Sequence, residues 1–301
     1  MNDGATAPWT DPHGTFTADD GVRLHAARAV PPGAPRAQLV ITHGFAEHGG
    51  RYGALAAACV QRGFAVHALD LRGHGRSPGR RALVRRAERL VRDVDGLLAW
   101  AAQQGAPVLA FGHSFGAAIT ARVVQQRPDA AAAVALSAPY LRTALPEPGW
   151  VLTLANVASR IAPALRTRPI DAGVVSSLPA EVRRYREDPR VDTGGVRLAS
   201  ARELHALGAR VLRDAHLLST PTLIVHGDDD RLAHPGGSRA LARDAGEAVT
   251  LHRVAGGWHD LLHDRDAAET RAVVTDWFEA RLQAAAEPDA SAGPARWGPS
   301  E

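Results

Sequence analysis

Short apolar runs of strand length recur along the chain, and stretches of helical period separate them. The runs occupy residues 38–44, 64–73, 107–114, 132–139, 221–228 and 249–256. This alternation is typical of a mostly parallel sheet covered by helices on both faces. Ahead of these runs, residues 14–30 carry Asp20 and Gly21 at a turn position and predict an antiparallel hairpin. The pattern therefore predicts the α/β fold class.

Residues 82–101 show the helical pattern most clearly. Apolar side chains recur there at positions 83, 87, 90, 91, 94, 97, 98 and 101. On a helix these positions share one face, and Arg85, Arg89 and Arg92 lie on the opposite one. We expect the arginine row to face water, with contact to an anion or a membrane surface as the alternative.

The rhythm of strands breaks between residues 140 and 216. This segment contains helical patterns punctuated by proline and no strand-like run. It predicts a helical cap, or lid, inserted into an α/β core that comprises residues 14–139 and 217–285. The two ends, residues 1–13 and 286–301, are broken by Pro and Gly and are predicted to be disordered tails.

Composition narrows the functional classes. All 35 basic residues are arginine and the formal net charge is only +3, so a nucleic-acid-binding face is not indicated. Cys59 is the single cysteine, which excludes an intrachain disulfide and a cysteine-based metal site. The N-terminal residues have no signal-peptide pattern, and no window approaches the roughly 18 apolar residues of a membrane span. We therefore expect a soluble, cytoplasmic protein.

A G-x-S-x-G motif is the first sign of chemistry. Gly112, Ser114 and Gly116 follow an apolar run and precede an Ala-rich helical pattern. In such a setting, flanking glycines permit a sharp turn that presents the serine hydroxyl above the sheet as a nucleophile. The alternative is a serine in an ordinary turn between a strand and a helix.

A serine nucleophile needs a general base, usually histidine, and a carboxylate that orients it. His259 follows the last apolar run in a Gly-rich loop, whereas His252 falls within that run and His263 beyond the loop. The carboxylate is expected after the preceding run, where residues 228–230 are all aspartate. Three consecutive aspartates are also common in turns, and their spacing does not fit a calcium site.

An oxyanion hole needs two backbone N–H groups aimed at the developing negative charge. Phe115, directly after Ser114, is placed to supply one of them. The loop after the run at 38–44 is expected to supply the other from Phe45. The glycine in that loop, Gly44, fits either a tight turn or the close approach of a substrate to the backbone.

Taken in order, the motifs "HGFAEHGGRYGALA", "LDLRGHGRS", "GHSFG", "SAPYL", "GDDDRLAHP" and "GWHDLLHD" resemble the monoacylglycerol lipase and lysophospholipase branch of the α/β-hydrolases. The likeness covers roughly residues 15–283 and implies an acyl ester hydrolase with Ser114 as nucleophile and His259 as base. In the family pattern the triad acid stands three residues after the Gly that ends the strand, which selects Asp230, with Asp228 as runner-up. The chain departs from the family in having Phe115 where methionine is usual.

The resemblance also implies an apolar acyl tunnel under the cap and a reaction that needs no metal or organic cofactor. The most favoured activity is that of a monoacylglycerol lipase. A lysophospholipase, a general carboxylesterase, a proline-iminopeptidase-like aminopeptidase and a non-catalytic ligand-binding relative remain as alternatives. Most of the apolar residues between 150 and 165 are expected to pack against the core. As the alternative, part of this surface makes transient contact with a membrane surface or lipid aggregate, whose head groups would meet Arg166 and Arg168. The sequence does not indicate an oligomeric state.

Overall fold

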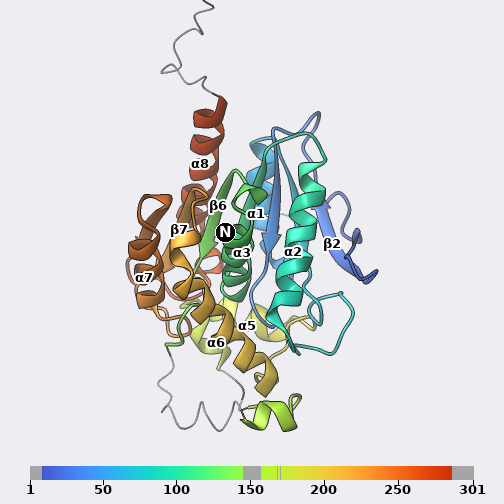
Figure 1. Ribbon diagram of the computed structural model, residues 1–301, viewed down its shortest axis with the longest axis vertical. Helices are drawn as coiled ribbons and strands as arrows, with labels where there is room; N and C mark the ends of the chain where they lie inside the picture. The colour runs from blue at the N-terminus through green and yellow to red at the C-terminus, as the bar shows by residue number, and fades with distance from the viewer. Residues whose placement is uncertain (1–8, 145–156, 168, 170, 287–301) are drawn as a thin grey trace, which may run out of the picture.

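A computed structural model describes residues 9–144, 157–167, 169 and 171–286 of the chain (Figure 1). Its centre is one eight-stranded sheet with the order β1-β2-β4-β3-β5-β6-β7-β8. The strands are β1 (Thr15–Thr17), β2 (Arg23–Ala29), β3 (Ala37–Thr42), β4 (Phe64–Leu69), β5 (Val108–His113), β6 (Ala133–Ser137), β7 (Thr222–Gly227) and β8 (Val249–Val254). β1 and β2 pair antiparallel, and β3 to β8 are parallel to one another.

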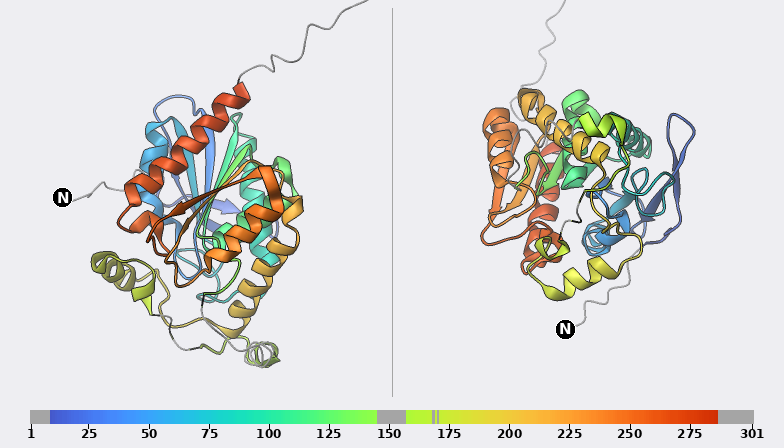
Figure 2. Two further views of the ribbon diagram at one scale, coloured as in Figure 1. Left: turned by 90° about the vertical axis from the view of Figure 1, so that its left-hand side faces the viewer. Right: turned by 90° about the horizontal axis from the view of Figure 1, so that it is seen from below.

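Helices cover both faces of the sheet (Figure 2). The described α-helices are α1 (Gly53–Gln61), α2 (Ala87–Ala102), α3 (Phe115–Gln126), α5 (Pro179–Glu187), α6 (Leu198–Arg213), α7 (Pro235–Ala245) and α8 (Ala267–Ala286). Single 3-10 turns are η1 (Gly49–Tyr52), η2 (Pro128–Ala130), η3 (Ala172–Val174), η4 (Ala215–Leu217), η5 (Gly246–Ala248) and η6 (Leu261–His263). α1 and α8 contribute to the apolar cluster on one face, and α2, α3, α6 and α7 to the cluster on the other.

The predicted fold class is confirmed. Each of the six apolar runs coincides with one parallel strand to within a few residues, with β3 beginning one residue before its run, and the residues of β3 to β7 are all buried. The hairpin at 14–30 is confirmed as well, since β1 pairs with β2 across a turn in which Gly21 has a φ of 79°. Strands buried on both faces need mostly apolar side chains, which explains why the runs were legible in the sequence.

The helix predicted over 82–101 begins later, at Ala87. The residues before it are held instead by the side chains of α6. The N–H of Val84 donates to Ser200 Oγ at 2.8 Å, and that of Ala87 donates to Glu203 Oε2 at 2.9 Å. Contacts with a distant helix thus replace the first helical turn that the local pattern favours.

The predicted arginine row is only partly solvated. Arg85 and Arg92 are exposed, but Arg89 is drawn into ion pairs with Asp93 on its own helix and with Asp19 in the β1–β2 turn. Arg89 therefore ties α2 to the hairpin at the edge of the sheet, a contact between segments 70 residues apart.

Between β6 and β7 the described residues form helices and isolated bridges. α5 and α6 lie at one end of the sheet (Figure 1). The second half of α6 packs along α3, where Leu207 and Val211 are fully buried. This half of the helix belongs to the same apolar cluster as α2 and α3.

The predicted tails lie mostly outside the described residues, which exclude 1–8 and 287–301. Residues 9–13 of the predicted N-terminal tail are described. Asp11 exchanges two backbone hydrogen bonds with Arg28 of β2, and Trp9 packs against the apolar cluster formed with α1 and α8. α8 extends to Ala286. None of the described helices combines the length and the apolar character needed to cross a membrane.

Candidate active site

Ser114 occupies a sharp turn between β5 and α3. Its backbone has φ 52° and ψ −116°, a left-handed conformation that costs energy for a residue with a side chain. The turn is possible because glycine flanks it. A Cβ on Gly112 would lie 2.6 Å from Ala117 Cα, and one on Gly116 would lie 2.3 Å from the carbonyl oxygen of His43. Both glycines of the motif are thus required by packing, and the serine is held at the carboxyl end of the strand.

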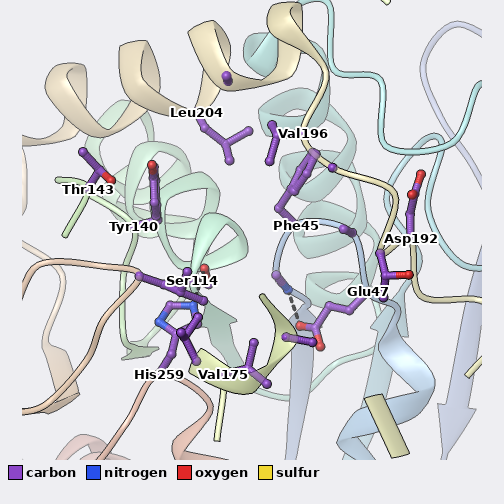
Figure 3. Close-up of a pocket in the computed structure, with 18 of the residues that line it drawn as sticks. Phe45, Glu47, Ser114, Tyr140, Thr143, Val175, Asp192, Val196, Leu204 and His259 are labelled. Carbon is purple, nitrogen blue, oxygen red and sulfur yellow. Dashed lines mark hydrogen bonds between the residues drawn. The ribbon is translucent and has the colours of Figure 1, made fainter. Parts of the chain in front are cut away.

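His259 connects Ser114 to one carboxylate of the triple aspartate. Its Nε2 lies 2.9 Å from Ser114 Oγ and its Nδ1 lies 2.7 Å from Asp230 Oδ2. All three side chains are buried (Figure 3 shows Ser114 beside His259). With Nδ1–H donating to the carboxylate, Nε2 is left to accept the hydrogen of the serine hydroxyl.

Electrostatics support this chain of hydrogen bonds. Burial lowers the pKa of His259, but the negative charge and hydrogen bond of Asp230 outweigh it, so the pKa lies above its ordinary value. Burial raises the pKa of Asp230, and the donors His259 and His226 more than offset this, so the carboxyl remains ionised at neutral pH. The pair is thus arranged to stabilise an imidazolium that forms transiently.

The other two aspartates point elsewhere. Asp228 forms a bidentate ion pair with Arg253 at 2.9 and 3.0 Å. Asp229 is exposed, and its N–H donates to the carbonyl of Gly257. Of the three carboxylates, Asp230 is therefore the one that faces His259.

The loop after β3 lies directly against the serine. A Cβ on Gly44 would lie 3.3 Å from Ser114 Cβ. His43 braces this loop: Leu71 N–H donates to its Nε2 at 2.9 Å, so Nδ1 carries the proton and donates to the Gly44 carbonyl at 2.6 Å. Phe45, which follows Gly44, packs edge-to-face with Phe115 at a ring-centroid distance of 6.3 Å. The structure thus brings together the two residues expected to form the oxyanion hole.

A buried carboxylate, Glu47, holds the same loop from behind. Its Oε1 accepts hydrogen bonds from Gly44 N–H and from Tyr52 OH, both at 2.6 Å (Figure 3 marks the first). Its Oε2 pairs with Arg51 Nε at 2.7 Å. Sequence reasoning missed this residue, although the spacing of Glu and Arg four residues apart in "EHGGR" was a usable signal.

Arg51 extends the network to the histidine loop and to α5. Its Nη2 donates at 2.5 Å to Oδ2 of Asp260, the residue that follows His259 in the chain. Its guanidinium lies over the ring of Tyr185 at 4.7 Å. Burial lowers the pKa of Arg51, but the negative charges of Asp260 and Glu47 outweigh this effect and leave the pKa above its ordinary value. The guanidinium is therefore always charged. One buried cation therefore links three segments that surround the serine.

A cavity of about 900 Å³ opens onto Ser114 and His259. Its floor is formed by loops at the carboxyl ends of the parallel strands. The segment between β6 and β7 also lines it: Val196 and Leu204 lie across the cavity from His259, and Val175 lies beside His259 (Figure 3). A largely apolar cavity with a few polar groups at one end is typical of a site for a small apolar ligand.

The carboxylates that line this cavity are paired with arginine. Glu47 and Asp260 share Arg51, and Asp192 binds Arg166 through a bidentate pair with distances of 2.8 and 2.7 Å. The fourth, Asp171, binds Arg186. Of the two arginines expected near a lipid head group, Arg166 is occupied by Asp192, and Arg168 lies outside the described residues.

The strand order and the serine turn define a protein of the α/β-hydrolase class. Residues 33–266 match the family model described as serine aminopeptidase S33, and the chain belongs to this family. The family resemblance predicted from the sequence motifs is thereby confirmed.

Relatives in several organisms carry lipase names. The chain is 34% identical to the monoacylglycerol lipase of Mycolicibacterium smegmatis over 89% of this chain and 97% of that one. It is 31% identical to the human monoglyceride lipase over 88% and 90% of the two chains. Among solved structures, the monoacylglycerol lipase of Paleococcus ferrophilus is 30% identical, with a TM-score of 0.78 over 86% of this chain and 99% of that one.

Proposed function

We propose that the protein is a carboxylic ester hydrolase that cleaves monoacylglycerols. The observation that carries this proposal is the chain of hydrogen bonds from Ser114 through His259 to Asp230. Ser114 and His259 line a large, mostly apolar cavity. Relatives named monoacylglycerol or monoglyceride lipase, with 31–34% identity over most of their length, support the substrate class.

The reaction proceeds by two acyl transfers. His259 Nε2 takes the proton of Ser114 as Oγ bonds to the ester carbonyl carbon, and the backbone N–H groups of Phe45 and Phe115 hold the oxyanion. Collapse of the tetrahedral intermediate breaks the ester bond, and His259 returns the proton to the departing glycerol oxygen. Water, deprotonated by His259, then releases the fatty acid and restores the serine. No step uses a metal or an organic cofactor.

An aminopeptidase activity fits the site less well. Binding a substrate ammonium in an apolar cavity requires a carboxylate that is free to pair with it, because an unpaired buried cation is costly. Each cavity carboxylate described above is already paired with arginine. Glu47 and Asp260 share one arginine, so a substrate ammonium would have to compete with a guanidinium for any of the described carboxylates that line the cavity.

A lysophospholipase activity is favoured by one specific feature. A second, polar cleft of about 340 Å³ is lined by Arg81, by Arg190, which pairs with Asp188, and by Arg166, which pairs with Asp192; it shares Asp192 and Thr193 with the main cavity. Arginine side chains bind phosphate well. A phosphate attached to the glycerol of an acyl ester could bind the arginines of this cleft, which adjoins the main cavity at Asp192 and Thr193.

A substrate panel separates these activities. We expect the highest kcat/KM on 1-oleoylglycerol, lower values on 1-oleoylglycerol 3-phosphate and p-nitrophenyl esters, and none on alanine p-nitroanilide. Arg81→Gln and Arg190→Gln leave the rate on 1-oleoylglycerol unchanged, with the exposed Arg213→Gln as the control. A preference for the phosphorylated ester that both cleft variants abolish would instead establish the lysophospholipase activity. Hydrolysis of none of the esters would refute the proposal.

We further propose that residues 140–216 form a cap that touches lipid aggregates. Three apolar side chains of this segment are turned to solvent, with exposed fractions of 52% for Val157, 83% for Ile161 and 60% for Leu165. Clusters of exposed large apolar side chains are uncommon unless they meet an apolar surface.

Replacing Ile161 and Leu165 together by serine is expected to weaken binding to phosphatidylcholine vesicles and to lower the rate on emulsified monoacylglycerol, because less apolar area enters the lipid. Hydrolysis of a soluble p-nitrophenyl ester remains at the wild-type rate. Leu217→Ser is the matched control, since Leu217 is 45% exposed but lies outside this segment. Equal vesicle binding by all three proteins would contradict the proposed contact.

A further inference from the structure

A histidine that the reaction does not use lies behind the Asp230 carboxylate. His226 is the fifth residue of β7 and is 1% exposed. Its Nε2 lies 3.2 Å from Asp230 Oδ2 and 3.1 Å from the carbonyl oxygen of Ala233. Its Nδ1 lies 2.6 Å from Ser238 Oγ on α7. A polar side chain in an otherwise apolar strand needs such partners to be buried at all.

These contacts determine which ring nitrogen carries the proton. Nε2 has two neighbours, the carbonyl of Ala233 and the ionised carboxylate of Asp230, and both can only accept hydrogen bonds. Nε2 is therefore protonated and donates, whether the ring is neutral or charged. In the neutral ring, Nδ1 accepts a hydrogen bond from the hydroxyl of Ser238. Ser238 thus fixes the ring, and the ring presents an N–H to the same carboxylate oxygen that receives His259 Nδ1–H.

Asp230 receives four donors in this arrangement. Leu232 and Ala233 supply backbone N–H groups to Oδ1 at 2.8 and 2.9 Å. Oδ2 is shared by His259 at 2.7 Å and His226 at 3.2 Å. Apart from His259, His226 is the one side chain among the described residues that donates to this carboxylate.

We propose that His226, oriented by Ser238, is a positioning residue that fixes the Asp230 carboxylate for His259 and withdraws part of its negative charge. This inference rests on the proposed serine hydrolase mechanism. Charge withdrawn from Asp230 weakens its attraction for the imidazolium, so His226 makes His259 a weaker base than it would be with Asp230 alone.

The other charged groups around His259 act alongside this effect. Asp260 and Glu47 also raise the pKa of His259, and the ring of His113 on β5 lies 5.0 Å from it. None of these groups contacts His226 in the hydrogen bonds described above. A change at position 226 therefore reaches His259 through Asp230 alone.

Two substitutions separate positioning from packing. A glutamine can place its amide N–H near the position of Nε2, whereas an asparagine reaches only to the position of Nδ1. His226→Gln therefore keeps a donor for Asp230, and His226→Asn removes it while keeping a polar partner for Ser238. Ser238→Ala frees the ring without touching Asp230.

The readout is the rate at which a fluorophosphonate labels Ser114, measured from pH 5 to 9. In that reaction Oγ bonds to phosphorus, fluoride leaves and His259 takes the proton, so the identity of the natural ester does not matter. We expect His226→Asn to lower the plateau rate about tenfold. The pH at which this variant reaches half of its plateau labelling rate moves about half a unit upward, because His259 binds its proton more tightly. His226→Gln stays within about threefold of wild type, and Ser238→Ala gives a smaller change in the same direction.

Failure to label the wild-type protein would refute the proposed function itself. Labelling of wild type with identical pH profiles for wild type and His226→Asn would overturn only the inference about His226. Equal losses in the glutamine and asparagine variants, with an unshifted profile and a lowered melting temperature, would show a packing role and also overturn it. If His226→Asn does not fold, the pH profile of Ser238→Ala decides: an upward shift supports the inference and an unchanged profile contradicts it.

Discussion

Replacement of Ser114 by alanine is expected to abolish ester hydrolysis, with a fall in kcat of at least about 10⁴-fold. Without Oγ, no acyl-enzyme forms. His259 and the loop after β3 that carries Phe45, here called the oxyanion loop, can promote only slow attack by water. The variant should keep its fold, since the deleted hydroxyl is a single atom whose hydrogen bond is made to His259. The measurement is kcat on 1-oleoylglycerol and on p-nitrophenyl butyrate, together with the melting temperature.

Ser219→Ala is the control for this experiment, because Ser219 is exposed and precedes β7, outside the loops that carry Ser114, Asp230 and His259. It should retain full activity. Residual activity of Ser114→Ala above about a hundredth of wild type would mean that another residue is the nucleophile, and the proposed mechanism would fall.

Asp230→Asn is the second large effect, with an expected loss in kcat on the order of 10⁴-fold. An asparagine can present N–H to His259 Nδ1, which stabilises the tautomer that carries its proton on Nε2 and cannot accept the serine hydrogen. It also removes the charge that raises the pKa of His259. The matched control is Asp228→Asn, two residues earlier in the same loop, which loses an ion pair with the exposed Arg253. Such surface pairs contribute little, so this variant should keep nearly full activity.

The reverse outcome, with Asp228→Asn inactive and Asp230→Asn nearly silent, would overturn the assignment of the acid. Comparable losses in both variants, with lowered melting temperatures, would show that the loop as a whole collapses. Circular dichroism on both proteins distinguishes that case from a specific loss of the carboxylate.

The fold could be predicted because its signals are local. Strands buried on both faces are mostly apolar, so the runs that match β3 to β7 stood out in the sequence. Ser114 and His259 could also be chosen from local patterns, a glycine-flanked turn and a glycine-rich loop. The residues alone did not distinguish among the aspartates at 228–230, and the choice of Asp230 came from the family pattern. Their three directions become visible only when the loop is folded, with Asp230 buried and Asp229 exposed.

What escaped prediction depends on contacts between distant segments. Arg51 and Asp260 are 209 residues apart, and neither has a sequence signal for the other. His226 read as one polar position in a strand, yet its two ring nitrogens meet groups from a following loop and from α7. The late start of α2 has the same origin, because side chains of α6 take the N–H groups of Val84 and Ala87.

The contacts between the oxyanion loop and the segment before α6 bear on protein engineering. Asp192 N–H donates to the carbonyl of Ala46 at 2.8 Å, and His48 Nε2 lies 2.8 Å from Asp188 Oδ2. The segment over the cavity is therefore fastened to the residues that bracket Glu47. A chimera that exchanges residues 140–216 for those of another family member, in order to change acyl preference, would leave these partners mismatched. A graft that preserves turnover must carry residues 44–52 along with the cap.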